Sequence, residues 1–497
     1  MKQLIHNGIY IPEEPVVVGL AIKIRNERIP LTPEQEIMAI SWARKINTPY
    51  AKDRRFVKNF FRDFRRALAL KEKVPPEAFD FSEVVKHLDR LKAQRESMST
   101  AEKQLEAEKR KKKREALLNT YGYATVDGKR MEIENYVAEP SGIFLGCAKH
   151  PLKGRWKPRP TEQDVILNLS PDAPRPPGNW GEIVWDPDST WVAKWRDKLN
   201  GKIKYVWLAA STPIKQVGDV EKFEKAKELA SKIDMVRGEI AHRLTDSDVR
   251  VRKLATAVYI IDSMNMRVGD EKDRDEADTA GTTTLKRDNV KIKENGVVLF
   301  DFYGKGAVKW HREKSVAPAV VENLTIFLNE PSEDIFTGIS SKAVNKFLGE
   351  IMSGLTAKVF RTFHATESAR QVLERAKVTK NDPDFLKRHV LILANLSAAK
   401  ICNHKKVPSK NWKEQLEKKK KRLAKLRQRN TRKSREAARK LALKISEMRM
   451  IRDYNLRTSL KSYIDPRVIL EWCKKAGYDW REYYPTTLQK RFSWVEK

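Results

Sequence analysis

Five short segments of this chain carry residues that could together transfer a phosphodiester to a protein hydroxyl. Such a transfer needs a nucleophile, cations around two non-bridging oxygens and an acid for the departing oxygen. Tyr, Arg, His and Lys can meet these needs without a metal ion. The segments are MRVGDEK with Arg267, FDFYGKG with Lys305, LTAKVFRTFHAT with Arg361, ICNHKKVP with His404 and TSLKSYIDPR with Tyr463.

Each segment alone carries little information. An arginine or lysine in such a chain is usually a solvated charge, and one of 8 histidines or 13 tyrosines is usually a packing or surface residue. An ATP-driven motor and a zinc hydrolase are disfavoured, because the sequence has no G-x-x-x-x-G-K-[ST] phosphate loop and no H-E-x-x-H motif. Its three cysteines, Cys147, Cys402 and Cys473, are too scattered for a disulfide framework or a cysteine-rich zinc site.

The charge of the chain indicates a polyanionic partner. Lys and Arg total 100 against 66 Asp and Glu, which gives a formal net charge of +34. Charge alone would also suit a ribosomal, RNA-binding or membrane-surface protein. No segment resembles a signal peptide or a membrane span, so we expect a soluble intracellular protein in a reducing compartment.

The N-terminal part predicts helices with basic faces. Thr32 to Gln35 and Ser99 to Glu102 read as capping boxes, each opening a helix. Phe56, Phe60 and Phe64 recur every four residues among arginines and lysines, which predicts one aromatic and one basic face. The six consecutive basic residues at 109–114 cannot share one face, so they predict a solvated helix.

Further along, the patterns alternate between strands and helices. Short β-rich runs from about 164 to 209 predict a small sheet domain, and helical patterns resume from about 222 to 266. The runs VVLFDFY and AVKWH flank GKGA and predict a hairpin with Lys305 at its turn. Two basic, thinly apolar helices predict a helical hairpin, with Trp412, Leu416 and Leu423 on the first and Ala437, Leu441, Met448 and Ile451 on the second.

In this order and setting the five segments resemble the active-site segments of the cellular type IB DNA topoisomerases, and the basic hairpin resembles their linker. The resemblance implies that Arg267, Arg361 and His404 hold the non-bridging oxygens and that Lys305 protonates the leaving 5′-oxygen. Tyr463 would form a 3′-phosphotyrosyl bond, without ATP or a cofactor. It also implies DNA contacts at Lys204, Thr279, Lys286, Lys358 and Asn403.

Three positions depart from the family pattern, and none is a reacting group. Gly306 follows the catalytic lysine where the eukaryotic enzymes have an acid, Ser462 replaces Asn before the tyrosine, and Cys147 replaces Arg. These changes affect the pocket where camptothecin-type drugs bind in that family. The linker also looks short, and the missing charged N-terminal extension and the compact length favour an archaeal source.

Two other functions compete. A tyrosine recombinase would share the nucleophile and most cations, but it typically shows H-x-x-R at the second arginine, where this chain has Lys358. A non-catalytic chromatin or RNA-binding protein would explain the charge but not the five segments.

We therefore expect an α+β fold that clamps duplex DNA as a monomer, with no membrane contact. Its parts would be a mixed α/β cap (1–212), a mainly helical recombinase-like catalytic domain (213–408), a helical-hairpin linker (409–455) and a small helical C-terminal domain (456–497). The expected location is the cytoplasm or nucleoid, or the nucleus if the source is eukaryotic.

Overall fold

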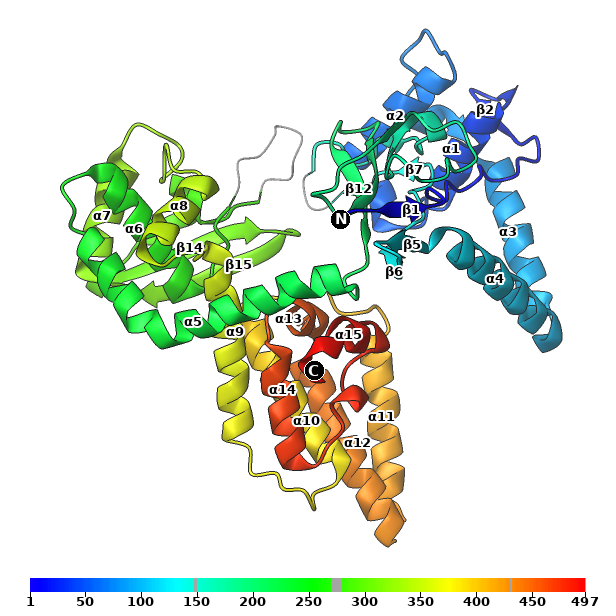
Figure 1. The fold of residues 1–497 in the computed structure, drawn as a ribbon. Coiled ribbons are helices and arrows are strands. Elements are labelled where there is room, and N and C mark those ends of the chain that lie inside the picture. The colour runs from blue at the N-terminus through cyan, green and yellow to red at the C-terminus, as the bar shows by residue number, and fades with distance from the viewer. Residues whose placement is uncertain (147–149, 270–278, 430, 497) are drawn as a thin grey trace. The chain divides into compact units, whose positions relative to one another are not determined.

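The computed structural model describes residues 1–146, 150–269, 279–429 and 431–496 (Figure 1). The chain forms two compact units, one of which holds Met1–Lys215 and the other Gln216–Lys272 and Asp278–Lys497. The mixed α/β architecture confirms the α+β class expected from the sequence. Among the described residues, no helix is both long enough and apolar enough to cross a membrane.

The first unit contains a seven-stranded sheet in the order β1-β5-β6-β12-β11-β9-β10. Its four later strands, β9 (Val165–Asn168), β10 (Glu182–Val184), β11 (Trp191–Arg196) and β12 (Ile203–Leu208), lie in the predicted β-rich region. Three earlier strands complete it: β1 (Leu4–His6), β5 (Tyr123–Val126) and β6 (Lys129–Glu134). The sequence therefore predicted too few strands for this sheet, because β6 pairs with β12, which lies far from it in the sequence.

A helical subdomain packs beside a three-stranded sheet in the same unit. The sheet joins β2 (Ala21–Ile24), β3 (Glu27–Pro30) and β4 (Phe79–Asp80), and the helices are α1 (Pro33–Ala43) and α2 (Arg54–Ala67). Phe56, Phe60 and Phe64 are fully buried, and Trp42 stacks on Phe60 at 4.7 Å between ring centroids. The predicted aromatic face of α2 is therefore confirmed.

Two longer helices, α3 (Ser82–Ser97) and α4 (Thr100–Tyr121), follow this core. Ser99 and Glu102 form the predicted capping box at the start of α4. No side chain of α4 is buried, and residues 109–114 are all exposed, as the solvated-helix prediction requires. A two-stranded sheet of β7 (Gly142–Ile143) and β8 (Trp156–Lys157) completes the unit.

The second unit has two hydrophobic cores. The first gathers α5 (Pro213–Arg243), α6 (Val249–Met264), α7 (Pro318–Asn329) and α8 (Ser341–Ile351) around a three-stranded sheet. The strands of this sheet are β13 (Val290–Ile292), β14 (Val297–Gly304) and β15 (Val308–Ser315). The second gathers α9 (Ala357–Glu374), α10 (Asp384–Ile401), α13 (Leu456–Ser462), α14 (Pro466–Ala476) and α15 (Thr486–Arg491). Helix α9 contributes to both cores, which places its N-terminal half between them.

The predicted helical hairpin is present as α11 (Trp412–Gln428) and α12 (Arg432–Met450), which lie side by side in Figure 1. Its buried side chains are few: Leu416, Ser434, Ala438 and Ile445. Leu441, Met448 and Ile451 of the predicted apolar stripe are partly buried, but Ala437 is exposed and its neighbour Ala438 is buried in its place. The hairpin has little core of its own, and most of its surface is charged.

Candidate active site

A tight β-hairpin carries Lys305. Strands β14 (Val297–Gly304) and β15 (Val308–Ser315) pair in register up to Gly304 opposite Val308, which leaves Lys305, Gly306 and Ala307 as the turn. Gly306 has a φ of 76°, a conformation that glycine adopts without steric penalty. The Lys305 side chain is exposed at this turn, as predicted.

Helix α9 carries Arg361, which is buried with only 3% of its surface exposed. Its Nη1 donates to the carbonyl of Asn265, where α6 ends in a left-handed residue, and its Nη2 donates to the carbonyl of Cys402 at 3.1 Å. Its Nε is buried and has no hydrogen-bond partner in the described part of the chain. A buried guanidinium with an unused donor is suited to binding an anion.

His404 follows the C-terminus of α10 in a turn that Asn403 closes with a φ of 52°. Its ring Nδ1 lies 2.7 Å from Oγ of Ser459, and its Nε2 lies 3.5 Å from Nη2 of Arg361. Burial, together with the charges of Arg361 and Arg267, lowers the pKa of His404 to about 3. The imidazole is therefore neutral at pH 7 in the absence of a bound anion.

Tyr463 directly follows α13, and its backbone N–H donates to the carbonyl of Ser459 at 2.9 Å. Its ring lies beside the ring of His404, with 5.1 Å between centroids, and the Arg361 guanidinium lies 5.1 Å from its centroid. Burial alone would raise the pKa of Tyr463, but the charges of Arg361 and Arg267 and a hydrogen bond from Arg361 together lower it. This environment favours the phenolate that a tyrosine nucleophile needs.

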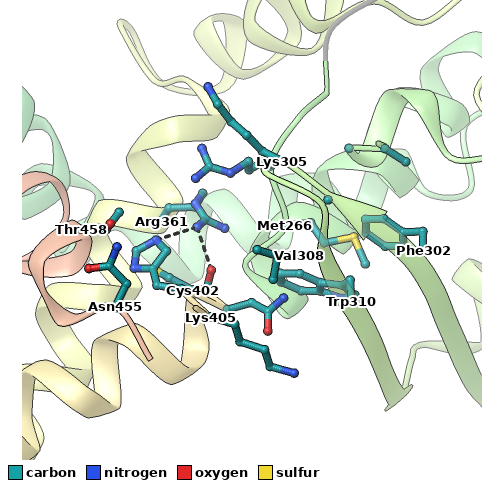
Figure 2. A pocket seen from close by; sticks show the side chains of 16 residues that line it. Met266, Phe302, Lys305, Val308, Trp310, Arg361, Cys402, Lys405, Asn455 and Thr458 are labelled. Atoms are coloured by element: carbon teal, nitrogen blue, oxygen red, sulfur yellow. Dashed lines mark hydrogen bonds between the residues drawn. The ribbon is translucent and has the colours of Figure 1, made fainter. Parts of the chain in front are cut away.

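Four of the five predicted residues line one pocket of about 170 Å³: Arg267, Lys305, Arg361 and His404. Figure 2 shows Arg361 with Asn455 and Thr458 on one side and Met266, Val308 and Trp310 on the other. Tyr463 does not line the pocket, but it contacts Arg361 and His404, which do. Arg267 is exposed just beyond α6, and the D-E-K end of its sequence segment lies outside the described residues.

Most of the residues expected to contact DNA lie outside this pocket. Only Asn403 lines the pocket, and its Nδ2 donates to the carbonyl of Lys309 at 3.2 Å. Lys358 is exposed in the first turn of α9, Lys286 pairs with Glu333 at 2.8 Å, and Thr279 is partly buried. Lys204 belongs to the first unit, where its Nζ lies 3.7 Å from Glu139. Cys147 lies outside the described residues.

Several residues that shape the site were missed from the sequence. Ser459 contacts His404, the carbonyl of Asn265 accepts from Arg361, and Arg312 of β15 donates from Nη2 to the carbonyl of Lys400 at 2.6 Å. The contacts to backbone carbonyls cannot be recognised from the sequence, because every residue has a carbonyl group. Ser459 lacks a distinctive signal as well, because a serine four residues before Tyr463, in a helix that ends at Ser462, is marked by neither its type nor its spacing.

Comparison with known families covers nearly the whole chain. Residues 1–208 match the family described as the DNA binding fragment of eukaryotic DNA topoisomerase I, residues 211–458 match its catalytic core, and residues 435–497 match the C-terminal topoisomerase domain. A chain with a tyrosine and its cations in this arrangement, matched along its length in this way, belongs to the eukaryotic DNA topoisomerase I family.

Named relatives agree with this membership. DNA topoisomerase 1 of Candidozyma auris is 35% identical over 82% of this chain and 56% of its own length. DNA topoisomerase 1 beta of Arabidopsis thaliana is 32% identical over 99% of this chain and 58% of its own length. DNA topoisomerase 1 of Homo sapiens is 30% identical over 99% of this chain and 70% of its own length. The chain thus spans less than two thirds of the first two relatives. All three relatives are eukaryotic and give no support to the archaeal source expected from the sequence.

Proposed function

We propose that this chain is a type IB DNA topoisomerase, which relaxes positive and negative supercoils by cutting one strand, allowing rotation and resealing the cut. One observation carries the proposal: Arg361 contacts the ring of Tyr463 while its Nη2 lies beside Nε2 of His404. A nucleophile, a buried cation and a second donor therefore share one site, although they come from three separate sequence segments.

The proposed reaction moves one phosphodiester bond. The phenolic oxygen of Tyr463 attacks phosphorus and gives its proton to solvent water, and the bond from phosphorus to the 5′-oxygen breaks. Lys305 gives that oxygen a proton and recovers one from solvent. Arg267, Arg361 and His404 hold the non-bridging oxygens, where negative charge develops. Religation is the reverse step, with the 5′-hydroxyl attacking the 3′-phosphotyrosyl bond.

This chemistry explains why neither ATP nor an obligatory metal is part of the proposal. The phosphotyrosyl bond keeps the energy of the phosphodiester, so resealing needs no external source. Three protein cations and a neutral imidazole supply the electrostatic stabilisation that metal ions provide in many other phosphoryl-transfer enzymes.

The partner in this proposal is duplex, supercoiled DNA, bound by a monomer. The first unit would act as a cap that closes on the duplex (1–212), and the second would carry the catalytic domain (213–408), the linker (409–455) and the tyrosine-bearing C-terminal domain (456–497). Lys204, Thr279, Lys286, Lys358 and Asn403 would contact the DNA backbone. The strongly basic composition supports this, because lysines and arginines that neutralise phosphates release counterions. The eukaryotic relatives favour a nuclear location.

The experiment is incubation of the purified chain with supercoiled plasmid in EDTA and without ATP. Stepwise relaxation to a ladder of topoisomers supports the proposal. Recombination that occurs only between specific sites would identify a tyrosine recombinase instead. Binding without any change in linking number would identify a non-catalytic DNA-binding protein.

A further inference from the structure

Ser459 lies where the segments of His404 and Tyr463 meet. It belongs to the last turns of α13, and its backbone carbonyl accepts from the N–H groups of Tyr463 at 2.9 Å and Ile464 at 3.1 Å. Its side chain contacts a different segment of the chain, with its hydroxyl 2.7 Å from Nδ1 of His404. One residue therefore holds both the nucleophile's backbone and the histidine ring.

The direction of the Ser459 hydrogen bond follows from burial. Ser459 is completely buried, and its hydroxyl has no other hydrogen bond in the part of the chain that the structure describes. A buried hydroxyl proton without an acceptor is unfavourable, so the hydroxyl must donate it to Nδ1. Nδ1 is then the unprotonated nitrogen, and the single ring proton of the neutral imidazole lies on Nε2.

This arrangement leaves two donors facing each other. Nε2 of His404 carries a hydrogen, and Nη2 of Arg361, which can only donate, lies 3.5 Å away. A distance of 3.5 Å is the limit for a hydrogen bond from Arg361 to an unprotonated Nε2, so it contributes much less than the 2.7 Å contact with Ser459. With the ring proton on Nε2, the two N–H groups cannot satisfy each other. An oxygen of an anion placed between them would accept from both. The low pKa of His404, caused first by burial, agrees with a ring that stays neutral until such an anion binds.

We propose that Ser459 is a positioning residue for His404, whose hydroxyl fixes the ring proton on Nε2 so that this nitrogen donates to the scissile phosphate. The inference rests on the proposed function for the identity of the anion, but the proton position itself does not depend on turnover. Ser459 does not touch the DNA in this account. It acts only through the histidine.

The test combines a spectroscopic signature with kinetics. In protein labelled with ring-¹⁵N histidine, solid-state ¹⁵N NMR distinguishes protonated from unprotonated nitrogens, and a His404→Gln sample identifies the His404 signals. We expect the proton on Nε2 in the unsubstituted protein. In Ser459→Ala, where Nδ1 has lost its donor, a substantial share of the ring should carry the proton on Nδ1. Single-turnover cleavage at saturating DNA should slow by about 10- to 100-fold, as is typical when a partner that orients an active-site histidine is removed, with DNA affinity unchanged.

Two further variants distinguish a loss of His404 positioning from a general disturbance of the fold. Ser397→Ala removes a partly buried serine pair with Ser368, 2.6 Å between hydroxyl oxygens, in the same unit but away from His404. It should leave both the ¹⁵N spectrum of His404 and the cleavage rate unchanged. Ser459→Thr keeps the hydroxyl and should restore the Nε2 proton and most of the rate.

An unchanged proton on Nε2 in Ser459→Ala, or a loss of cleavage in Ser397→Ala equal to that in Ser459→Ala, would overturn the inference. Its failure is distinct from failure of the proposed function. If the unsubstituted protein relaxes plasmid while Ser459→Ala keeps the proton position and the rate, only the role of Ser459 is wrong. If the unsubstituted protein does not relax plasmid, the proposed function is wrong whatever the spectrum shows.

Discussion

The guanidinium of Arg361 lies 5.1 Å from the ring centroid of Tyr463 and also donates to the carbonyl of Cys402, just before the turn that holds His404. One buried cation therefore orients the histidine turn and supplies positive charge beside the tyrosine. Helix α9, which carries Arg361, contributes to both cores of its unit.

Arg361→Lys should be far more damaging than a conservative exchange of charge suggests. The planar guanidinium reaches the carbonyls of Asn265 and Cys402 with two separate nitrogens held in a fixed fork, whereas an ammonium offers a single nitrogen on a flexible stem. We expect cleavage to fall by about 10²- to 10³-fold, the usual result of losing one transition-state donor. Arg370→Lys is a matched control, because Arg370 lies on the same helix with 41% of its side chain exposed. Single-turnover cleavage of a defined duplex measures both, and equal effects would contradict the role given to Arg361.

Lys305→Ala should slow cleavage of ordinary DNA but not of a substrate whose leaving 5′-oxygen is replaced by sulfur. A thiolate leaves without a proton, so the general acid is no longer needed. Lys305 stands at the hairpin turn and lines the pocket, which gives its ammonium access to the leaving group. Equal defects on the two substrates would mean that Lys305 has another role.

His404 should remain neutral in the DNA-free protein down to about pH 5, because its pKa in the folded state is about 3 against 6.5 for the free side chain. The unfolded chain binds a proton at His404 below pH 6.5 and the folded chain does not. The free energy of unfolding should therefore fall as the pH is lowered from 6.5 toward 3. Urea unfolding between pH 8 and pH 5 measures this slope. His404→Gln should make this slope shallower without abolishing it, because burial also lowers the pKa of His6, to about 4. An equally steep slope in that variant would place the titrating group elsewhere.

Gly306→Asp should increase trapping of the covalent complex by camptothecin-type drugs. The added carboxylate would restore an acceptor that the family pattern has beside the catalytic lysine, and a Cβ at Gly306 meets nothing within 4 Å. Aspartate tolerates the left-handed conformation that its φ of 76° requires. One hydrogen bond of roughly 0.5–1.5 kcal/mol corresponds to about a 2- to 10-fold gain in drug potency.

Gly338→Asp is the matched control for this experiment. Gly338 has a φ of 78°, and its added Cβ would also meet nothing within 4 Å, but it does not line the active-site pocket. Covalent-complex accumulation across a drug titration should respond to the change at 306 and not at 338. Equal responses would show that added charge, and not the pocket, sets the sensitivity.

The sequence predicted those elements whose signals are local. Capping residues, the four-residue spacing of Phe56, Phe60 and Phe64, and the glycines around Lys305 each act within a few residues, and the corresponding helices and hairpin are present. The size of the main sheet was not predictable in this way. It depends on the pairing of β6 with β12, and the sequence of neither strand indicates which distant strand it pairs with.

The site was predictable in part for the same reason. The reactive side chains could be chosen by residue type and by resemblance to a known family, but the groups that hold them could not. Arg361 is held by two backbone carbonyls, and His404 by a serine whose side chain has no distinctive signal of its own. These contacts arise from the way α6, α9, α10 and α13 pack.

The most direct test of the proposed function is to identify the residue that becomes attached to DNA. The chain is mixed with a duplex labelled on one strand and denatured rapidly, and the labelled peptide is sequenced by mass spectrometry. We expect a single adduct at Tyr463, joined to the 3′-phosphate of the cut strand, and a Tyr463→Phe variant that binds DNA normally but forms no adduct. An adduct at another tyrosine, attachment to a 5′-phosphate, or plasmid relaxation by Tyr463→Phe would contradict it.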